Sequence, residues 1–134
     1  MWLTDYDMSV ALNHTIVYAK DKRESAAFVS EVLGLPEPIA FGPFLEIKTG
    51  NGVDLAFMNH PGPIDSQHYA FLVSEAEFDA AFGRIQARGL EYWADPAKKR
   101  LGEINHNDGG RGVYFEEPAG HFLELLTVPY GGWP

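Results

Sequence analysis

Residues 111–128 have the sequence Arg111-Gly-Val-Tyr-Phe-Glu-Glu-Pro-Ala-Gly-His-Phe-Leu-Glu-Leu-Leu-Thr-Val128. Two apolar runs flank a Pro and a Gly, a pattern that predicts a β-hairpin. Tyr114 and Glu124 are polar positions inside the two predicted strands. Because a carboxylate in such a strand needs water, a hydrogen-bonding partner or a metal ion, we interpret Glu124 as one ligand of a metal site.

The first half of the chain predicts a strand, a helix and then two or three strands. Residues 10–19 predict a strand whose two faces are both largely apolar, so we expect both faces to be covered. A capping-box pattern starts at Asp21, and Gly34 stands where the following amphipathic helix should end. Residues 44–48 and 53–58 then predict two strands that are joined by a Gly-rich turn.

The second half repeats this order of elements. Residues 67–73 predict a strand, Ser74 starts a second capping-box pattern, Gly89 should end the helix, and a hairpin over 113–128 closes the chain. A duplicated βαβββ unit accounts for the repeat. The sequence therefore predicts an α+β fold in which residues 1–134 form one domain, made of a module at 10–60 and a module at 66–128.

The repeat also relates four residues that bind metals well. His14 opens the first strand of one module as His68 opens the first strand of the other, and Asp54 and Glu124 each lie between two hydrophobic residues in the last strand of their module. If the two modules curl as one mixed sheet around a shared cavity, all four residues should lie on its walls. We therefore expect a metal-binding cavity.

Composition and charge restrict the chemistry. The 134 residues suffice for one domain and include no cysteine, so a metal must be held by nitrogen and oxygen. The formal charge of -9 disfavours nucleic acid and anionic membranes as partners. The acidic N-terminus lacks the pattern of a signal peptide, and no apolar run is long enough to cross a bilayer. We expect a soluble, unprocessed cytoplasmic protein that acts on a small molecule.

From Leu12 to about Val128 the chain resembles the vicinal oxygen chelate superfamily. This group includes glyoxalase I, the bleomycin and fosfomycin resistance proteins, and the type I extradiol dioxygenases. The resemblance implies that His14, His68 and Glu124 are the metal ligands. It also implies a homodimer, and it leaves open whether the ligands of one site come from one chain or from two.

The resemblance extends to the signature of the extradiol dioxygenases, carried by Ile104-Asn-His106, Val113-Tyr114, Glu117-Pro118-Ala-Gly120 and Glu124. It implies that His106 acts beside the metal without binding it and that Tyr114 hydrogen-bonds near the substrate hydroxyls. Two histidines and one carboxylate on Fe(II) leave up to three coordination positions open for a bidentate substrate and dioxygen. The first expectation is therefore an iron(II) dioxygenase that cleaves the ring of a small catechol-like compound.

Two other functions remain open. The first is a glyoxalase-like lyase or isomerase, in which Asp54 is a fourth ligand of nickel or zinc, with manganese also possible. In the dioxygenase, by contrast, Asp54 is a substrate-binding group in the pocket. In a drug-binding resistance protein, aromatic walls hold a flat antibiotic without catalysis, and Phe57, Tyr69 and Phe71 are the candidates. His60 and His121 are predicted to be surface residues.

Overall fold

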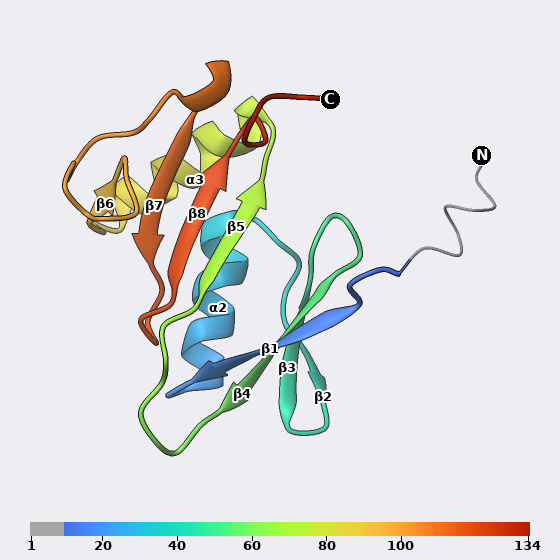
Figure 1. The fold of residues 1–134 in the computed structure, drawn as a ribbon. Helices are drawn as coiled ribbons and strands as arrows, with labels where there is room; N and C mark the ends of the chain where they lie inside the picture. The colour runs from blue at the N-terminus through green and yellow to red at the C-terminus, as the bar shows by residue number, and fades with distance from the viewer. Residues whose placement is uncertain (1–9) are drawn as a thin grey trace.

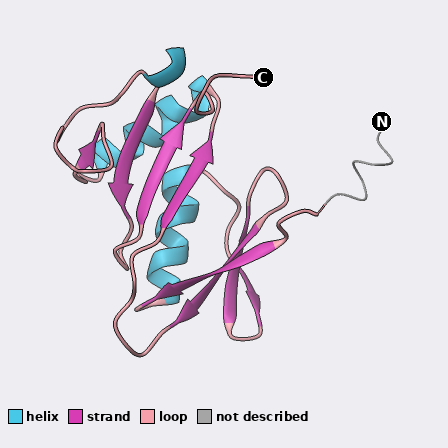
Figure 2. Cartoon of the chain, viewed as in Figure 1, coloured by secondary structure: helices cyan, strands magenta, loops and turns pink. Residues whose placement is uncertain are grey.

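The computed structural model describes residues 10–134. These residues form two four-stranded mixed sheets and two α-helices, with strand orders β1-β4-β3-β2 and β5-β8-β7-β6 (Figures 1 and 2). Both helices lie behind the sheets in this view. The elements are β1 (His14–Ala19), α2 (Lys22–Leu33), β2 (Ile39–Phe41), β3 (Phe44–Lys48), β4 (Asp54–Asn59), β5 (His68–Leu72), α3 (Glu75–Ala87), β6 (Tyr92–Trp93), η1 (Asn107–Gly109), β7 (Gly112–Glu116) and β8 (Phe122–Leu126).

The two sheets have the same topology, which confirms the predicted α+β fold of paired βαβββ modules. In each, the first strand pairs in parallel with the last strand, and the last strand pairs antiparallel with the strand before it. The first strand is shorter than predicted, because regular pairing begins only at His14. The two-residue strand β6 was not predicted, since so short an element has no periodic pattern.

The helices begin and end where the sequence indicates. Asp21 accepts a hydrogen bond from the backbone of Arg23 at the start of α2, and Gly34 ends this helix with a positive φ of 69°. At the start of α3, Ser74 and Glu77 form the predicted reciprocal capping box. Neither helix of residues 10–134 has the length and hydrophobicity that a membrane span needs.

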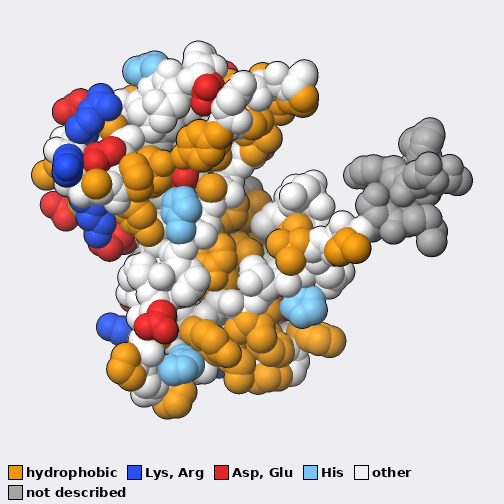
Figure 3. All heavy atoms as spheres, viewed as in Figure 1, with side chains coloured by type: hydrophobic (Ala, Val, Ile, Leu, Met, Phe, Trp, Pro, Cys, Tyr) orange, Lys and Arg blue, Asp and Glu red, His pale blue; other side chains and the backbone are white. Residues whose placement is uncertain are grey.

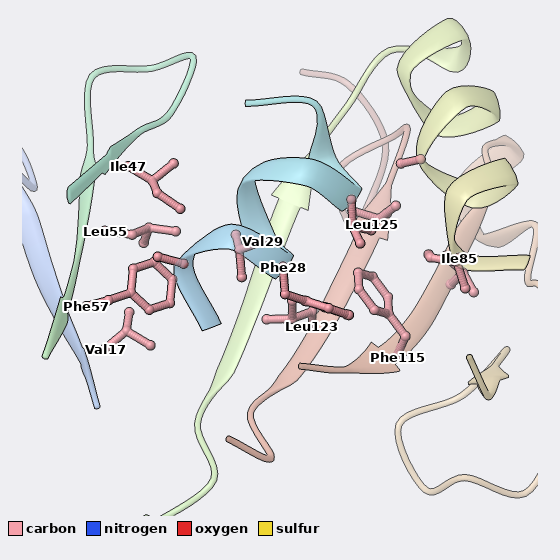
Figure 4. Packing of buried hydrophobic residues seen from close by; sticks show 14 of the residues in the cluster. Val17, Phe28, Val29, Ile47, Leu55, Phe57, Ile85, Phe115, Leu123 and Leu125 are labelled. Atoms are coloured by element: carbon pink, nitrogen blue, oxygen red, sulfur yellow. The ribbon is translucent and has the colours of Figure 1, made fainter. Parts of the chain in front are cut away.

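The core lies between the sheets and around α2. In Figure 4, α2 stands between the two modules, with Val29 on the side of Phe57 and Phe28 on the side of Leu123 and Phe115. The rings of Phe28 and Phe115 are 6.4 Å apart. One helix thus contributes to the burial of one face of each sheet.

The other face of each sheet is open. On β1 the alternating residues Ile16 and Tyr18 are 39% and 43% exposed, and Leu72 is exposed on β5. Figure 3 shows this side of the molecule, where hydrophobic side chains and histidines gather over both sheets. The expectation that both faces of the first strand are covered is therefore wrong for a single chain. The exposed hydrophobic residues are a reason to look for a partner that covers this face.

A buried histidine joins the two modules. His121 is 1% exposed, so the prediction that it is a surface residue is wrong. Its Nδ1 atom accepts a hydrogen bond from the backbone N–H of Gln67 at 3.0 Å, so the proton of the neutral ring is on Nε2. Nε2–H donates to the carbonyl oxygen of Tyr18 at 2.7 Å. The turn of the last hairpin is thereby bonded to the edge strand of the first sheet.

The strand register corrects one element of the predicted repeat. His14 lies opposite Asp54, whereas His68 lies opposite Phe122. Glu124 lies two residues further along β8, so its equivalent in the first module is Ala56 and not Asp54. The first module therefore has no carboxylate at the position of Glu124.

Candidate metal centre

His68 and Glu124 form a close pair on the open face of the second sheet. His68 is the first residue of β5, and Glu124 is two residues beyond its parallel partner on β8. The Nε2 atom of His68 lies 3.0 Å from Oε1 of Glu124. Glu124 is only 2% exposed, whereas the side chain of His68 is 48% exposed. The pair thus presents a buried carboxylate beside an accessible imidazole.

The hydrogen bond on the far side of His68 determines which atom is available to a metal. Nδ1 lies 3.0 Å from the carbonyl oxygen of Phe122, which can only accept, so Nδ1 carries a proton. The neutral ring then points the Nε2 lone pair at the carboxylate of Glu124. Two hydrogen-bond acceptors that face each other repel unless a proton or a metal cation lies between them. In metal-binding histidines, the ring nitrogen that does not bind the metal usually donates its N–H to a carboxylate, a backbone carbonyl or a water molecule.

The separation of the two atoms also fits one metal ion. Protein nitrogen and oxygen ligands bind first-row metals at about 2.0–2.2 Å, so two ligands at right angles lie about 3 Å apart. The distance of 3.0 Å between Nε2 of His68 and Oε1 of Glu124 agrees with this value. The donors are one nitrogen and one oxygen, as required in a chain that has no cysteine. These residues fit the divalent metal that the sequence implies.

Two tyrosines extend the pair. The hydroxyl of Tyr130 donates to Oε2 of Glu124, and the hydroxyls of Tyr114 and Tyr130 are 2.8 Å apart. Burial, and next the hydrogen bond between the two phenols, raises the pKa of Tyr114 far above its usual value near 10. Burial and the hydrogen bond to Glu124 raise the pKa of Tyr130. Sequence reasoning missed Tyr130, and its only signal is a tyrosine in a Pro-Tyr-Gly-Gly turn just after the last strand.

The surroundings of the pair are aromatic and include Lys98, whose ammonium group forms an ion pair with Glu116 at 2.8 Å. The ring of Tyr114 stacks on those of Phe122 and His68, with centroids 5.4 and 5.9 Å apart. The Nζ atom of Lys98 lies 5.2 Å from the ring of Phe122 and 5.0 Å from that of Trp93. Flat aromatic molecules suit such surroundings.

His14 and Asp54 lie in the other sheet, opposite each other on β1 and β4. Nδ1 of His14 donates to the side-chain oxygen of Asn13 at 2.8 Å, so the lone pair of Nε2 is presented outward from an exposed ring. Asp54 forms an ion pair with Lys48 at 3.4 Å. Within residues 10–134, no three His, Asp or Glu side chains come close enough to hold a metal. One chain therefore does not place the four predicted residues on the walls of one cavity.

His106 is exposed and lies just before η1. The preceding residue, Asn105, is buried and anchors this loop, because its side chain donates to the carbonyl of Ala94 at 2.9 Å and accepts from the backbone of Asn107 at 3.2 Å. The His106 ring makes no hydrogen bond to the described residues. The structure therefore fixes the loop, but His106 forms no hydrogen bond with His68 or Glu124 in the described chain.

A cleft of about 300 Å³ lies elsewhere, between the two modules, and its lining includes Tyr18, His60 and Tyr69. Neither His68 nor Glu124 contributes to it. Phe57, which was predicted to line a drug-binding cavity, is 1% exposed in the core, so that prediction is wrong.

Comparison with known proteins identifies the family. Residues 11–125 match the sequence pattern of the glyoxalase/bleomycin resistance protein/dioxygenase superfamily. The chain belongs to this superfamily. The resemblance to the vicinal oxygen chelate proteins is thus confirmed, and with it membership of a group that includes metal-dependent enzymes.

Three similar proteins illustrate the range of relatives. The glutathione transferase FosA of Serratia marcescens is 30% identical over 124 residues, which cover 88% of this chain and 81% of that protein. The structure of the oxidase ChaP-H1 is 58% identical with a TM-score of 0.91 and covers 92% of this chain and 100% of its own. The oxidase ChaP-H2 has the same identity and TM-score, with 93% of this chain and 98% of its own covered.

Proposed function

We propose that this protein is an iron(II)-dependent oxidoreductase of the extradiol dioxygenase type, which uses dioxygen to cleave the ring of a small catechol-like compound. The observation that carries the proposal is the His68–Glu124 pair, in which the Nε2 atom of His68 and the carboxylate oxygen Oε1 of Glu124 face each other 3.0 Å apart. The 58% identity to two oxidases supports redox chemistry over group transfer. Nitrogen and oxygen ligands in a facial set suit non-haem iron.

The third ligand in this proposal is His14 of a second copy of the chain. His14 resembles His68 in having Nδ1 bonded to a neighbouring oxygen. The Nε2 atom of His14 is left available, whereas that of His68 faces Glu124. The open faces that carry His14 and His68 also expose Ile16, Tyr18 and Leu72, which a second copy would cover. A two-fold homodimer would thus form two equivalent sites, each with one histidine from one chain and the His68–Glu124 pair from the other.

The residues around the pair have separate tasks in this reaction. Bound iron would supply a Lewis acid that attracts the substrate oxygens and an electron source for dioxygen. The hydroxyl of Tyr114 donates a hydrogen bond to the hydroxyl oxygen of Tyr130. The oxygen of Tyr114 therefore remains able to accept a hydrogen bond from a substrate hydroxyl. His106, on its exposed loop, is the candidate to exchange a proton with the substrate.

Oxygen consumption tests the reaction directly. Protein loaded with Fe(II) without air should take up oxygen when catechols are added, and the ring-cleaved product should absorb in the visible range. The variant Glu124→Gln should lose this activity, while Glu103→Gln, which changes an exposed carboxylate paired with Arg100, should keep it. Absence of oxygen uptake across a panel of catechols, with the metal bound, would exclude the ring-cleavage proposal.

Mixing two inactive variants tests whether the site is shared between chains. His14→Ala and Glu124→Gln homodimers would each lack a complete site, but a mixed dimer would contain one intact site. Random exchange of subunits should therefore restore about a quarter of the sites, because half of the dimers are mixed and each has one of its two sites intact. No recovery after exchange would argue against a shared site.

Two observations favour testing other reactions as well. The 30% identity to a glutathione transferase calls for an assay with glutathione and a small electrophile. Asp54 lies opposite His14, so a second copy that contributes His14 would also bring Asp54 near the metal, as a glyoxalase-like lyase requires. Asp54→Asn should leave the metal content unchanged in the dioxygenase and reduce it in the lyase.

A further inference from the structure

The C-terminal tail folds back so that its tyrosine reaches the candidate ligand Glu124. After β8 the chain makes a tight turn in which the backbone N–H of Gly132 bonds to the carbonyl oxygen of Pro129 at 2.9 Å. Gly131 in this turn has a φ of 84°, a conformation that side chains other than glycine rarely adopt. The turn places the hydroxyl of Tyr130 against Oε2 of Glu124.

The direction of each hydrogen bond follows from the groups involved. A carboxylate can only accept, so Tyr130 donates its single proton to Oε2 of Glu124. Tyr130 then has only its oxygen lone pairs for Tyr114, which must donate to it. The chain of bonds therefore runs from Tyr114 to Tyr130 to Oε2, while Oε1 faces His68 on the other side.

We infer that Tyr130 is a positioning residue which keeps Oε2 of Glu124 engaged, so that Glu124 binds the metal through Oε1 alone. The inference rests on the proposed metal site and adds a consequence to it. A carboxylate that binds through one oxygen occupies one coordination position, whereas a bidentate carboxylate occupies two. Tyr130 would thus leave one more position open for substrate or dioxygen.

The geometry separates this role from simple covering of the site. A tail that only excludes water would need no hydrogen bond to the oxygen turned away from His68. The phenol of Tyr130 instead bonds to that oxygen, and a second phenol, Tyr114, fixes its direction. Outer partners of this kind orient metal-binding carboxylates and control how they bind.

Cobalt(II) binding tests the inference without turnover, because its visible spectrum reports the coordination number. The parent protein and Tyr130→Phe would be titrated with Co²⁺ while absorption is recorded. If Glu124 becomes bidentate in the variant, the visible bands should weaken several-fold, since six-coordinate cobalt absorbs less than ions of lower coordination number. Gly131→Ala, which strains the turn but keeps the phenol, should shift the spectrum in the same direction.

Tyr92→Phe is the matched control, because it removes a phenol whose one hydrogen bond in the described chain is a long contact of 3.5 Å with Gln86. Its spectrum should equal that of the parent. If the parent binds cobalt and Tyr130→Phe gives the same spectrum, this inference is overturned but the proposed metal site is not. A spectral change of equal size in Tyr92→Phe would also overturn it. Failure of the parent to bind cobalt at all would overturn both proposals.

Discussion

The Nε2–H group of His121 donates a hydrogen bond to the backbone carbonyl of Tyr18, 2.7 Å away, although the two residues are 103 positions apart in the sequence. On the other side of the ring, Nδ1 accepts from the backbone of Gln67. One buried imidazole therefore holds together the first sheet, the linker between the modules and the last hairpin.

Replacement of His121 should destabilise the fold. His121→Phe keeps an aromatic ring but leaves the Tyr18 carbonyl and the Gln67 N–H without a partner, at a cost of about 2–4 kcal/mol in the free energy of unfolding. Urea denaturation should show a lower midpoint at an unchanged slope. His60→Phe, at a half-buried position whose ring packs edge-on against Tyr18, should change stability by no more than about 0.5 kcal/mol. Equal midpoints for the two variants would contradict the assigned role.

The three predicted ligands should each be required for metal binding. Elemental analysis of the parent protein should find about one divalent ion per chain, and His14→Ala, His68→Ala or Glu124→Ala should abolish binding. Circular dichroism should show that the variants remain folded. His60→Ala is the control, because His60 is not one of the predicted ligands. This variant should keep the metal. Full metal occupancy in all three variants would refute the site.

His106 should affect turnover but not metal content. The loop that carries it is anchored by Asn105, so His106→Ala should retain the metal and most of the stability. Loss of a positioned acid or base typically lowers the rate on the order of 100-fold to 10,000-fold. Catechol cleavage by His106→Ala at the parent rate would remove the support that the dioxygenase signature gives.

Tyr114 should ionise only at very alkaline pH. Its pKa is raised above the usual value near 10, first by burial and then by the bond to Tyr130. In the unfolded chain the phenol ionises near pH 10, whereas in the folded chain it ionises only at higher pH. The neutral phenol therefore contributes stability that is fully present below pH 10 and is lost as the pH rises further, because ionisation then favours the unfolded chain. Absorbance at 295 nm in the parent minus Tyr114→Phe isolates this group. A midpoint near 10 in the difference curve would show that the phenol is not held as described.

Local chemistry explains which parts of the fold were predictable. The cap at Ser74 and the positive φ at Gly34 depend on neighbouring residues only, so the sequence indicates the helix ends directly. The sequence also marks His68 and Glu124 as polar residues, each within an otherwise apolar strand. Their contact depends on the pairing of β5 with β8, which no local pattern specifies.

The errors have equally specific causes. Asp54 and Glu124 were predicted to be equivalent positions because each has a hydrophobic residue on both sides. Since such alternation repeats every two residues along a strand, it identifies the face of the sheet but not the strand register. His121 follows a glycine in a turn and for that reason resembles an exposed residue, yet the turn packs against β1. Tyr130 lies beyond the last strand, and a turn at Gly131 brings it to the carboxylate.

The separation of His14 from the His68–Glu124 pair has a thermodynamic consequence. If two chains must meet to complete one set of ligands, the metal increases the affinity of the chains for each other, and by the same factor the second chain increases the affinity for the metal. A chelator would then promote dissociation, and added metal would promote association. Dilution alone would release the metal and stop the reaction, without any change in the metal concentration of the surroundings.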